Sequence, residues 1–227
     1  MPQQIRLPWI TSIESRFSAG FAEHDVLVGL DYLHLDDGYK FASNVYGGQF
    51  DLYDPVYGQS VLDLIQRIDF RMKRRQFGLY AQDQMRWNNW IVTAGLRHDW
   101  IAADSTSNIA QPFSVDEGAV TGRLGLTYRF DSGFAPYIAY STSFDPVDGI
   151  STTGGSLRPL EGKQIEAGVK YESPDGRTFV TLAAFHLDQK NSTAPNHDPA
   201  GNGLFQVGTA ESAGCSSRGE NGADQQP

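Results

Sequence analysis

The stretch Ala119-Val-Thr-Gly-Arg-Leu-Gly-Leu-Thr-Tyr-Arg-Phe130 alternates between two kinds of side chain. In an extended chain Val120 and Leu124 fall on one face, whereas Arg123 falls on the other. A strand of about ten residues with one apolar and one charged face is typical of a transmembrane β-barrel wall, because lipid lies outside it. Strands of soluble proteins are usually shorter, about five or six residues.

The same alternation recurs along most of the chain. It predicts strands over residues 15–22, 26–35, 75–87, 90–102, 118–130, 134–144, 163–172 and 177–190, and a ninth that begins at Phe205. Short connections rich in turn-forming residues fall at 23–25, 88–89, 131–133 and 173–176. Long connections alternate with them, at about 36–74, 103–117, 145–162 and 191–204. This asymmetry predicts an all-β, antiparallel transmembrane β-barrel segment of about eight or nine strands, with periplasmic turns and extracellular loops.

Composition sets further limits on the kind of protein. The net charge of −9 over 227 residues argues against a nucleic-acid partner, which would require clustered Lys and Arg. A single cysteine, Cys215, excludes an intrachain disulfide. No run of about 18 apolar residues is present, so a helical membrane span is not expected. The first residues show no secretory signal peptide, which an exported protein would require.

A soluble antiparallel β-sandwich is the main structural alternative, because its strands alternate in the same way. Periodicity alone does not separate the two. Strand length and turn asymmetry favour the membrane barrel. Aromatic residues near strand ends, such as Trp87, Trp90 and Trp100, also favour it, since such residues gather at lipid headgroups.

Four motifs then point to a family. They are Gly78-Leu-Tyr-Ala-Gln-Asp-Gln-Met-Arg-Trp87, Val92-Thr-Ala-Gly-Leu-Arg-His-Asp-Trp100, Pro136-Tyr-Ile-Ala-Tyr-Ser-Thr-Ser-Phe-Asp-Pro146 and Leu160-Glu-Gly-Lys-Gln-Ile-Glu-Ala-Gly-Val-Lys-Tyr171. In this order and spacing the sequence resembles the TonB-dependent siderophore receptors of bacterial outer membranes. It is most similar to the ferrichrome and ferrioxamine type, which takes up hydroxamate siderophores. Val28-Gly-Leu-Asp-Tyr32, Leu52-Tyr-Asp-Pro-Val56 and Phe205-Gln-Val-Gly208 support that choice.

The resemblance implies a 22-stranded barrel with an N-terminal plug, located in the bacterial outer membrane. The implied partners are a ferric hydroxamate siderophore, the TonB complex acting through the plug, and outer-membrane lipid or lipopolysaccharide. No enzyme activity and no cofactor are implied. The 227 residues contain no plug and no TonB box, so we expect the chain alone not to be transport-competent.

The resemblance also divides the chain into three parts. Residues 1–10 are an atypical N-terminal segment, and residues 11–208 correspond to a partial receptor barrel. Residues 209–227 show no periodicity and are rich in Gly, Ser, Glu and Gln, which predicts a disordered tail. We hypothesise that the reading frame changes near Gly208.

No catalytic or metal-binding group of residues is evident, since the five histidines show no close pairing. Inward-facing charges are expected to pair with one another or with the plug, because a charge away from water requires a partner. These charges are Arg97, Arg123, Arg129, Glu166 and Lys170. The candidate ligand-binding residues are the aromatic side chains of Tyr39, Phe41 and Tyr46, which would contact a siderophore by shape. A passive porin or adhesin barrel and a soluble β-sandwich binding module are the alternative functions.

Overall fold

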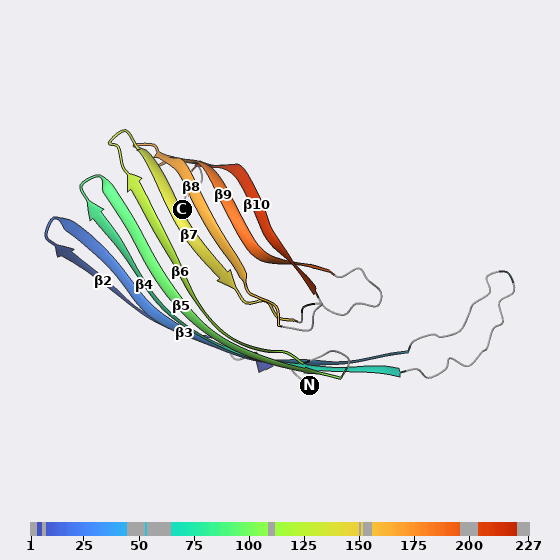
Figure 1. Ribbon diagram of the computed structural model, residues 1–227. Coiled ribbons are helices and arrows are strands. Elements are labelled where there is room, and N and C mark those ends of the chain that lie inside the picture. The colour runs from blue at the N-terminus through green and yellow to red at the C-terminus, as the bar shows by residue number, and fades with distance from the viewer. Residues whose placement is uncertain are drawn as a thin grey trace, which may run out of the picture.

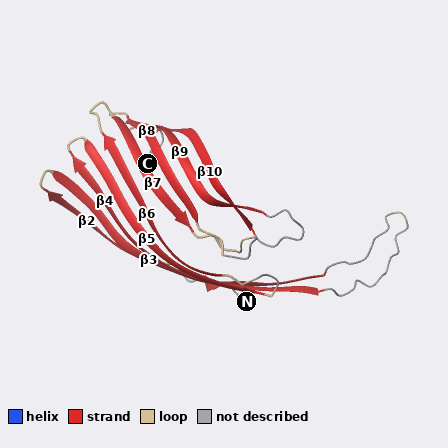
Figure 2. Cartoon of the chain, in the orientation of Figure 1, coloured by secondary structure: helices blue, strands red, loops and turns tan. Residues whose placement is uncertain are grey.

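The computed structural model describes residues 4–5, 8–44, 53, 65–108, 112–149, 151, 156–195 and 204–221. Within these ranges every regular element is a strand (Figure 2). In the same part of the chain, no helix is long and apolar enough to cross a membrane.

The strands form one curved antiparallel sheet (Figure 1). They are β1 (Gln4–Ile5), β2 (Trp9–Ala19), β3 (Ala22–Asn44), β4 (Ile65–Trp87), β5 (Trp90–Ser107), β6 (Ser114–Tyr128), β7 (Phe134–Asp145), β8 (Leu160–Glu172), β9 (Thr178–Pro195) and β10 (Leu204–Asn221). Neighbours in sequence are neighbours in the sheet from β3 to β10, while β1 and β2 both pair with β3. This meander confirms the predicted all-β, antiparallel architecture and the strand predicted to begin at Phe205.

The register keeps the two faces of the sheet separate across the strands. Ala94 lies opposite Leu124, Leu124 opposite Tyr140, and Tyr140 opposite Ile165, which gives one apolar row over four strands. Leu124 and Ile165 are 57% and 54% exposed. We call this side the outer face and the side that carries Arg97 the inner face. An apolar face this wide and this exposed is what a lipid-facing barrel wall requires.

Three of the four predicted turns lie where the sequence indicates. Asn88 adopts φ 50° between β4 and β5, and Gly133 adopts φ 90° between β6 and β7. A side chain at Gly133 would meet the carbonyl oxygen of Glu172, so this turn requires glycine. In the turn before β9 the Ser173 hydroxyl and the Arg177 N–H donate hydrogen bonds that lower the pKa of Asp175.

The first turn differs from the prediction. It lies at Gly20–Phe21, with Gly20 at φ 61°, and not at residues 23–25. Glu23 and Asp25 belong to β3, where both fall on the inner face. Their polarity therefore marks the face of a strand, whereas Gly20 supplies the positive φ that a tight turn needs.

The C-terminal segment also differs from the expectation of disorder. Residues 209–221 continue β10 and pair with β9 from Thr209–Lys190 to Asn221–Thr178. The backbone ladder of β9 supports this strand although its own side chains show no clear alternation, because ladder hydrogen bonds do not depend on side-chain type. Residues 222–227 lie outside the described part, and the frame change stays a hypothesis.

Candidate functional site: the inner face of the sheet

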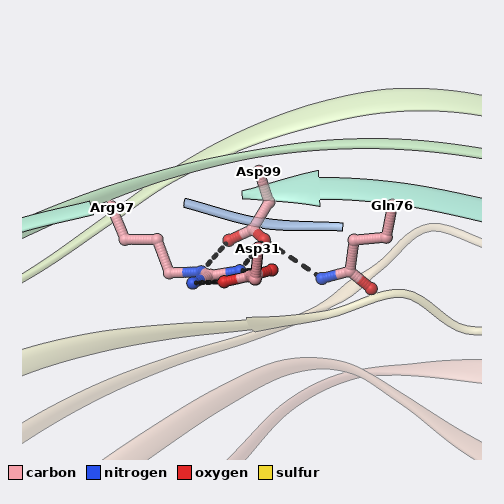
Figure 3. Close-up of polar contacts among 4 residues, drawn as sticks. All are labelled: Asp31, Gln76, Arg97 and Asp99. Carbon is pink, nitrogen blue, oxygen red and sulfur yellow. Dashed lines mark hydrogen bonds and ion pairs between the residues drawn. The ribbon is translucent and has the colours of Figure 1, made fainter. Parts of the chain in front are cut away.

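A charged cluster on the inner face joins three strands (Figure 3). The guanidinium of Arg97 on β5 donates to both carboxylate oxygens of Asp31 on β3, at 2.6 Å and 3.0 Å. It also donates to Asp99, from Nε at 2.7 Å and from Nη2 at 2.6 Å. Gln76 on β4 donates a further bond of 3.0 Å to Asp99. Four guanidinium bonds to two carboxylates fix the position of Arg97, because bidentate pairs of this kind are strong and directional.

A glycine makes this arrangement possible. Gly78 on β4 lies in register with Asp31 on one side and with Asp99 on the other. A methyl group at Gly78 would come within 2.1 Å of Arg97 Nη2 and 2.8 Å of Asp31 Oδ1. The guanidinium therefore lies directly over the glycine backbone, and it is 5.7 Å from the centre of the Tyr80 ring.

The burial of Asp99 shows how far this cluster is withdrawn from water. Asp99 is 5% exposed, whereas the side chains of Arg97 and Asp31 are 31% and 22% exposed. A buried carboxylate is stable only with partners, and Arg97 supplies the positive one. The cluster carries two negative charges against one positive charge.

A second polar group lies further along the inner face. Tyr137 on β7 donates a hydrogen bond of 2.5 Å to Glu166 on β8, and Gln164 donates to the other carboxylate oxygen of Glu166 at 3.0 Å. The ammonium of Lys170 lies 5.1 Å from the centre of the Tyr137 ring. Tyr137 thus links Glu166 and Lys170, two of the charges that the sequence places inward.

The connection between β7 and β8 is attached to the inner face near the loop end of the strands. Asp148 forms an ion pair with Arg74 on β4, and the Ser156 hydroxyl donates to the carbonyl of Ser114 on β6. Leu157 is 1% exposed, as is Ala103 on the inner face of β5. Gln206 on β10 binds both the N–H and the carbonyl of Arg158. These contacts attach Asp148, Ser156 and Arg158 of this connection to the wall.

The five inward charges meet different partners. Arg97 pairs with two aspartates and with none of the other four charges. Arg123 forms no ion pair within the described residues, and it lines a hollow of about 290 Å³ together with Arg97 and Tyr80. Arg129 is held through its backbone, which donates to the Asn89 carbonyl at 2.8 Å. Sequence reasoning missed Asp31 and Asp99 as partners, although their alternation places both on the inner face.

The predicted ligand-binding aromatic residues lie apart from these clusters. Tyr39 lies level with Ser107, the last residue of β5, and Phe41 lies two residues further along β3; each is 55% exposed. The Tyr39 ring stacks on Phe70 of β4, with centroids 5.3 Å apart. An ion pair of 2.8 Å between Lys40 and Asp69 joins the same two strands. Tyr46 lies outside the described residues.

The described residues hold no group of three His, Cys, Asp or Glu side chains that could bind a metal ion. The inner face offers paired charges, tyrosine rings and amide groups. Such groups bind a solute or another protein segment by hydrogen bonds and shape.

Comparison with known proteins identifies the family. Residues 5–215 match the family described as TonB dependent receptor-like, beta-barrel. The ferrioxamine B receptor of Salmonella typhimurium is 35% identical over 205 residues, which cover 89% of this chain and 28% of that receptor. The ferrichrome outer membrane transporter/phage receptor of Escherichia coli K12 is 33% identical, over 87% of this chain and 27% of its own length. The chain thus spans about a quarter of the length of these relatives.

Solved structures show the same fold. The ferric-catecholate import receptor of Escherichia coli K12 matches with a TM-score of 0.72 at 19% identity, over 94% of this chain and 35% of that one. The ferripyoverdine receptor of Pseudomonas aeruginosa matches with a TM-score of 0.70 at 21% identity, over 97% of this chain and 30% of that one.

A sheet with one exposed apolar face and one face of paired charges is the wall of a transmembrane β-barrel. Within that class, this chain belongs to the TonB-dependent receptors, a family of outer-membrane receptors rather than enzymes. The resemblance seen in the four sequence motifs is therefore confirmed.

Proposed function

We propose that this chain forms part of the barrel wall of an outer-membrane receptor that takes up a ferric siderophore of the hydroxamate type. The inner face carries the proposal, because the aspartates bound to Arg97 and the hydrogen bond from Tyr137 to Glu166 give a polar surface along which a solute can pass. The names of the relatives at 35% and 33% identity, ferrioxamine B receptor and ferrichrome transporter, support the hydroxamate class. Energy for uptake would come from the TonB complex acting through a plug.

A hybrid receptor tests this function. The matching segment of the ferrichrome transporter is replaced by residues 5–215 in a strain without hydroxamate receptors, and uptake of radioactive iron is measured. We expect uptake from a ferric hydroxamate and none from a ferric catecholate. The unmodified transporter is the control. A hybrid that is correctly folded, as judged by heat-modifiable electrophoretic mobility, but does not bind a ferric hydroxamate contradicts the proposal.

We propose further that Tyr39 and Phe41 contact the siderophore at the extracellular end, together with Tyr46. Stacking of Tyr39 on Phe70 supports this role, because it holds an exposed aromatic ring in a fixed place on the inner-face side. The Lys40–Asp69 ion pair joins the same two strands. Replacing Tyr39 or Phe41 with alanine is expected to weaken binding of a ferric hydroxamate by about two- to tenfold. Phe17→Ala, on the outer face near the opposite end, is the matched control. Equal affinity in all three variants contradicts this assignment.

A further inference from the structure

Strands β6 and β7 pair over only part of their length. The register runs from Arg123–Ser141 to Thr127–Tyr137, although β6 continues to Ser114 and β7 to Asp145. By contrast, β6 pairs with β5 along the whole of Ser114–Tyr128. Toward the loop end the wall therefore contains a gap between β6 and β7, and Figure 1 shows these two strands diverging there.

Contacts close this gap at both ends. At the end next to the last paired residues, Arg123 and Ser141, the N–H of Gly122 donates to Thr142 Oγ1 at 2.9 Å, so a side chain takes the place of a backbone partner. At the loop end the Ser156 hydroxyl donates to the Ser114 carbonyl at 2.9 Å. Between these contacts lies a hollow of about 740 Å³. This volume lies within the range of about 300–1,000 Å³ that is usual for ligand pockets.

The backbone of β6 presents donors and acceptors to the gap. The N–H of Gly122 and the carbonyl of Ser114 both point toward it, and in an antiparallel strand every second residue points the same way. Gly118 and Val120 line the hollow, and each is an even number of residues from Ser114 and Gly122, so their backbone groups point the same way. Their backbone groups therefore face a space in which no described strand pairs with them. An open strand edge of this kind binds an added strand through main-chain hydrogen bonds.

The side chains around the gap indicate the charge of such a strand. Arg158, Lys163 and Lys190 line the hollow, and the carboxylates are Glu117 and Glu161. Three positive charges against two negative charges favour an acidic partner. We propose that the gap binds an extended, acidic segment of another protein, which pairs with β6 at Gly118 and Val120. An anionic lipid would meet the same cations, but it has no row of alternating donors and acceptors to match the strand.

Engineered disulfides test the gap itself. If the register of β7 on β6 continued, Thr121 would lie opposite Ser143. In the full chain in detergent, with Cys215→Ser, we compare the pair Thr121→Cys/Ser143→Cys with the pair Gly125→Cys/Ala139→Cys, which lies within the observed register. We expect oxidation to cross-link only the second pair, because a disulfide requires Cβ atoms about 3.5–4.5 Å apart. Equal cross-linking of the two pairs overturns the proposal, as does a control pair that does not cross-link.

Peptide binding tests the partner. The probe is a fluorescent octapeptide of alternating valine and glutamate, and fluorescence anisotropy reports its binding to the full chain in detergent. Lys163→Glu/Lys190→Glu is expected to weaken binding about tenfold, whereas Lys73→Glu, away from the gap, leaves it unchanged. Methylation of the peptide's backbone nitrogens is expected to abolish binding. Equal binding of the methylated peptide would show a purely ionic contact and overturn the proposal, as would equal binding of a valine–lysine peptide.

Discussion

Arg97 on β5 binds Asp31 on β3 across the full width of β4, through two hydrogen bonds of 2.6 Å and 3.0 Å. The strand that they cross contributes Gly78, whose missing side chain leaves room for the guanidinium. Three strands are thereby joined by side chains as well as by their backbones. Such a cross-link resists shear between strands in a wall that has few buried hydrophobic side chains among the described residues.

Replacing Arg97 with glutamine is expected to destabilise the folded sheet by about 1–3 kcal/mol, because the buried Asp99 loses its positive partner. The exposure of the cluster keeps this below the cost for a fully buried pair. The measurement is urea-induced unfolding in detergent, followed by tryptophan fluorescence. Arg177→Gln, at a side chain that is 80% exposed, should change the unfolding free energy by less than about 0.5 kcal/mol. Equal losses in both variants would contradict the assigned role.

Gly78→Ala tests the same cluster from the backbone side. The added methyl group would displace the guanidinium from its carboxylates, which we expect to destabilise the sheet by about 1–3 kcal/mol. Gly125→Ala is the control, since its nearest neighbours would be 3.9 Å away. In the Arg97→Gln background the cost of Gly78→Ala should shrink, because the two residues act through one contact. If the costs of the two substitutions simply add in this double-mutant cycle, Gly78 and Arg97 do not act through a shared contact.

The outer face should not accept a charge. Leu124→Arg is expected to cost about 2–4 kcal/mol in a bilayer, the range for arginine on the lipid face near the membrane centre. Gln82→Arg on the inner face should cost far less, since water or polar groups can reach it. Folding into lipid vesicles at increasing urea concentration measures both. If both substitutions cost the same, the orientation of the sheet in the membrane is not the one described.

The ion pair between Arg74 and Asp148 is expected to restrain the connection between β7 and β8. The Arg74 Nε is buried without a partner, so the remaining charge contact matters. Asp148→Asn should raise the rate of chymotryptic cleavage after Leu157 by about tenfold, because cleavage requires this buried residue to become exposed. Asp145→Asn, at the end of β7, is the matched control. An unchanged rate in Asp148→Asn would show that other contacts hold the segment.

Sequence alone predicted the two faces, because each side chain's face in a strand depends only on its position along the chain. It also predicted the turns at Asn88 and Gly133, where local residue chemistry decides the backbone. Strand lengths were underestimated. Residues 36–44 extend β3 and residues 65–74 extend β4, although the sequence there resembles a loop. Pairing between the two strands stabilises this extension, and such pairing is not a property of either segment alone.

The alternation of Ala119 to Phe130 and its neighbours determined an all-β sheet and the side on which each charge lies, and strand length and turn asymmetry then favoured a membrane wall. Tertiary structure decided which charges meet. Asp31 and Arg97 are 66 residues apart in the sequence. They meet because the register places Gly78, which has no side chain, on the strand between them. The register also decided where β6 stops pairing with β7 and where residues 209–221 find a partner strand. These outcomes depend on backbone hydrogen bonds between distant segments, which side-chain patterns within one strand do not encode.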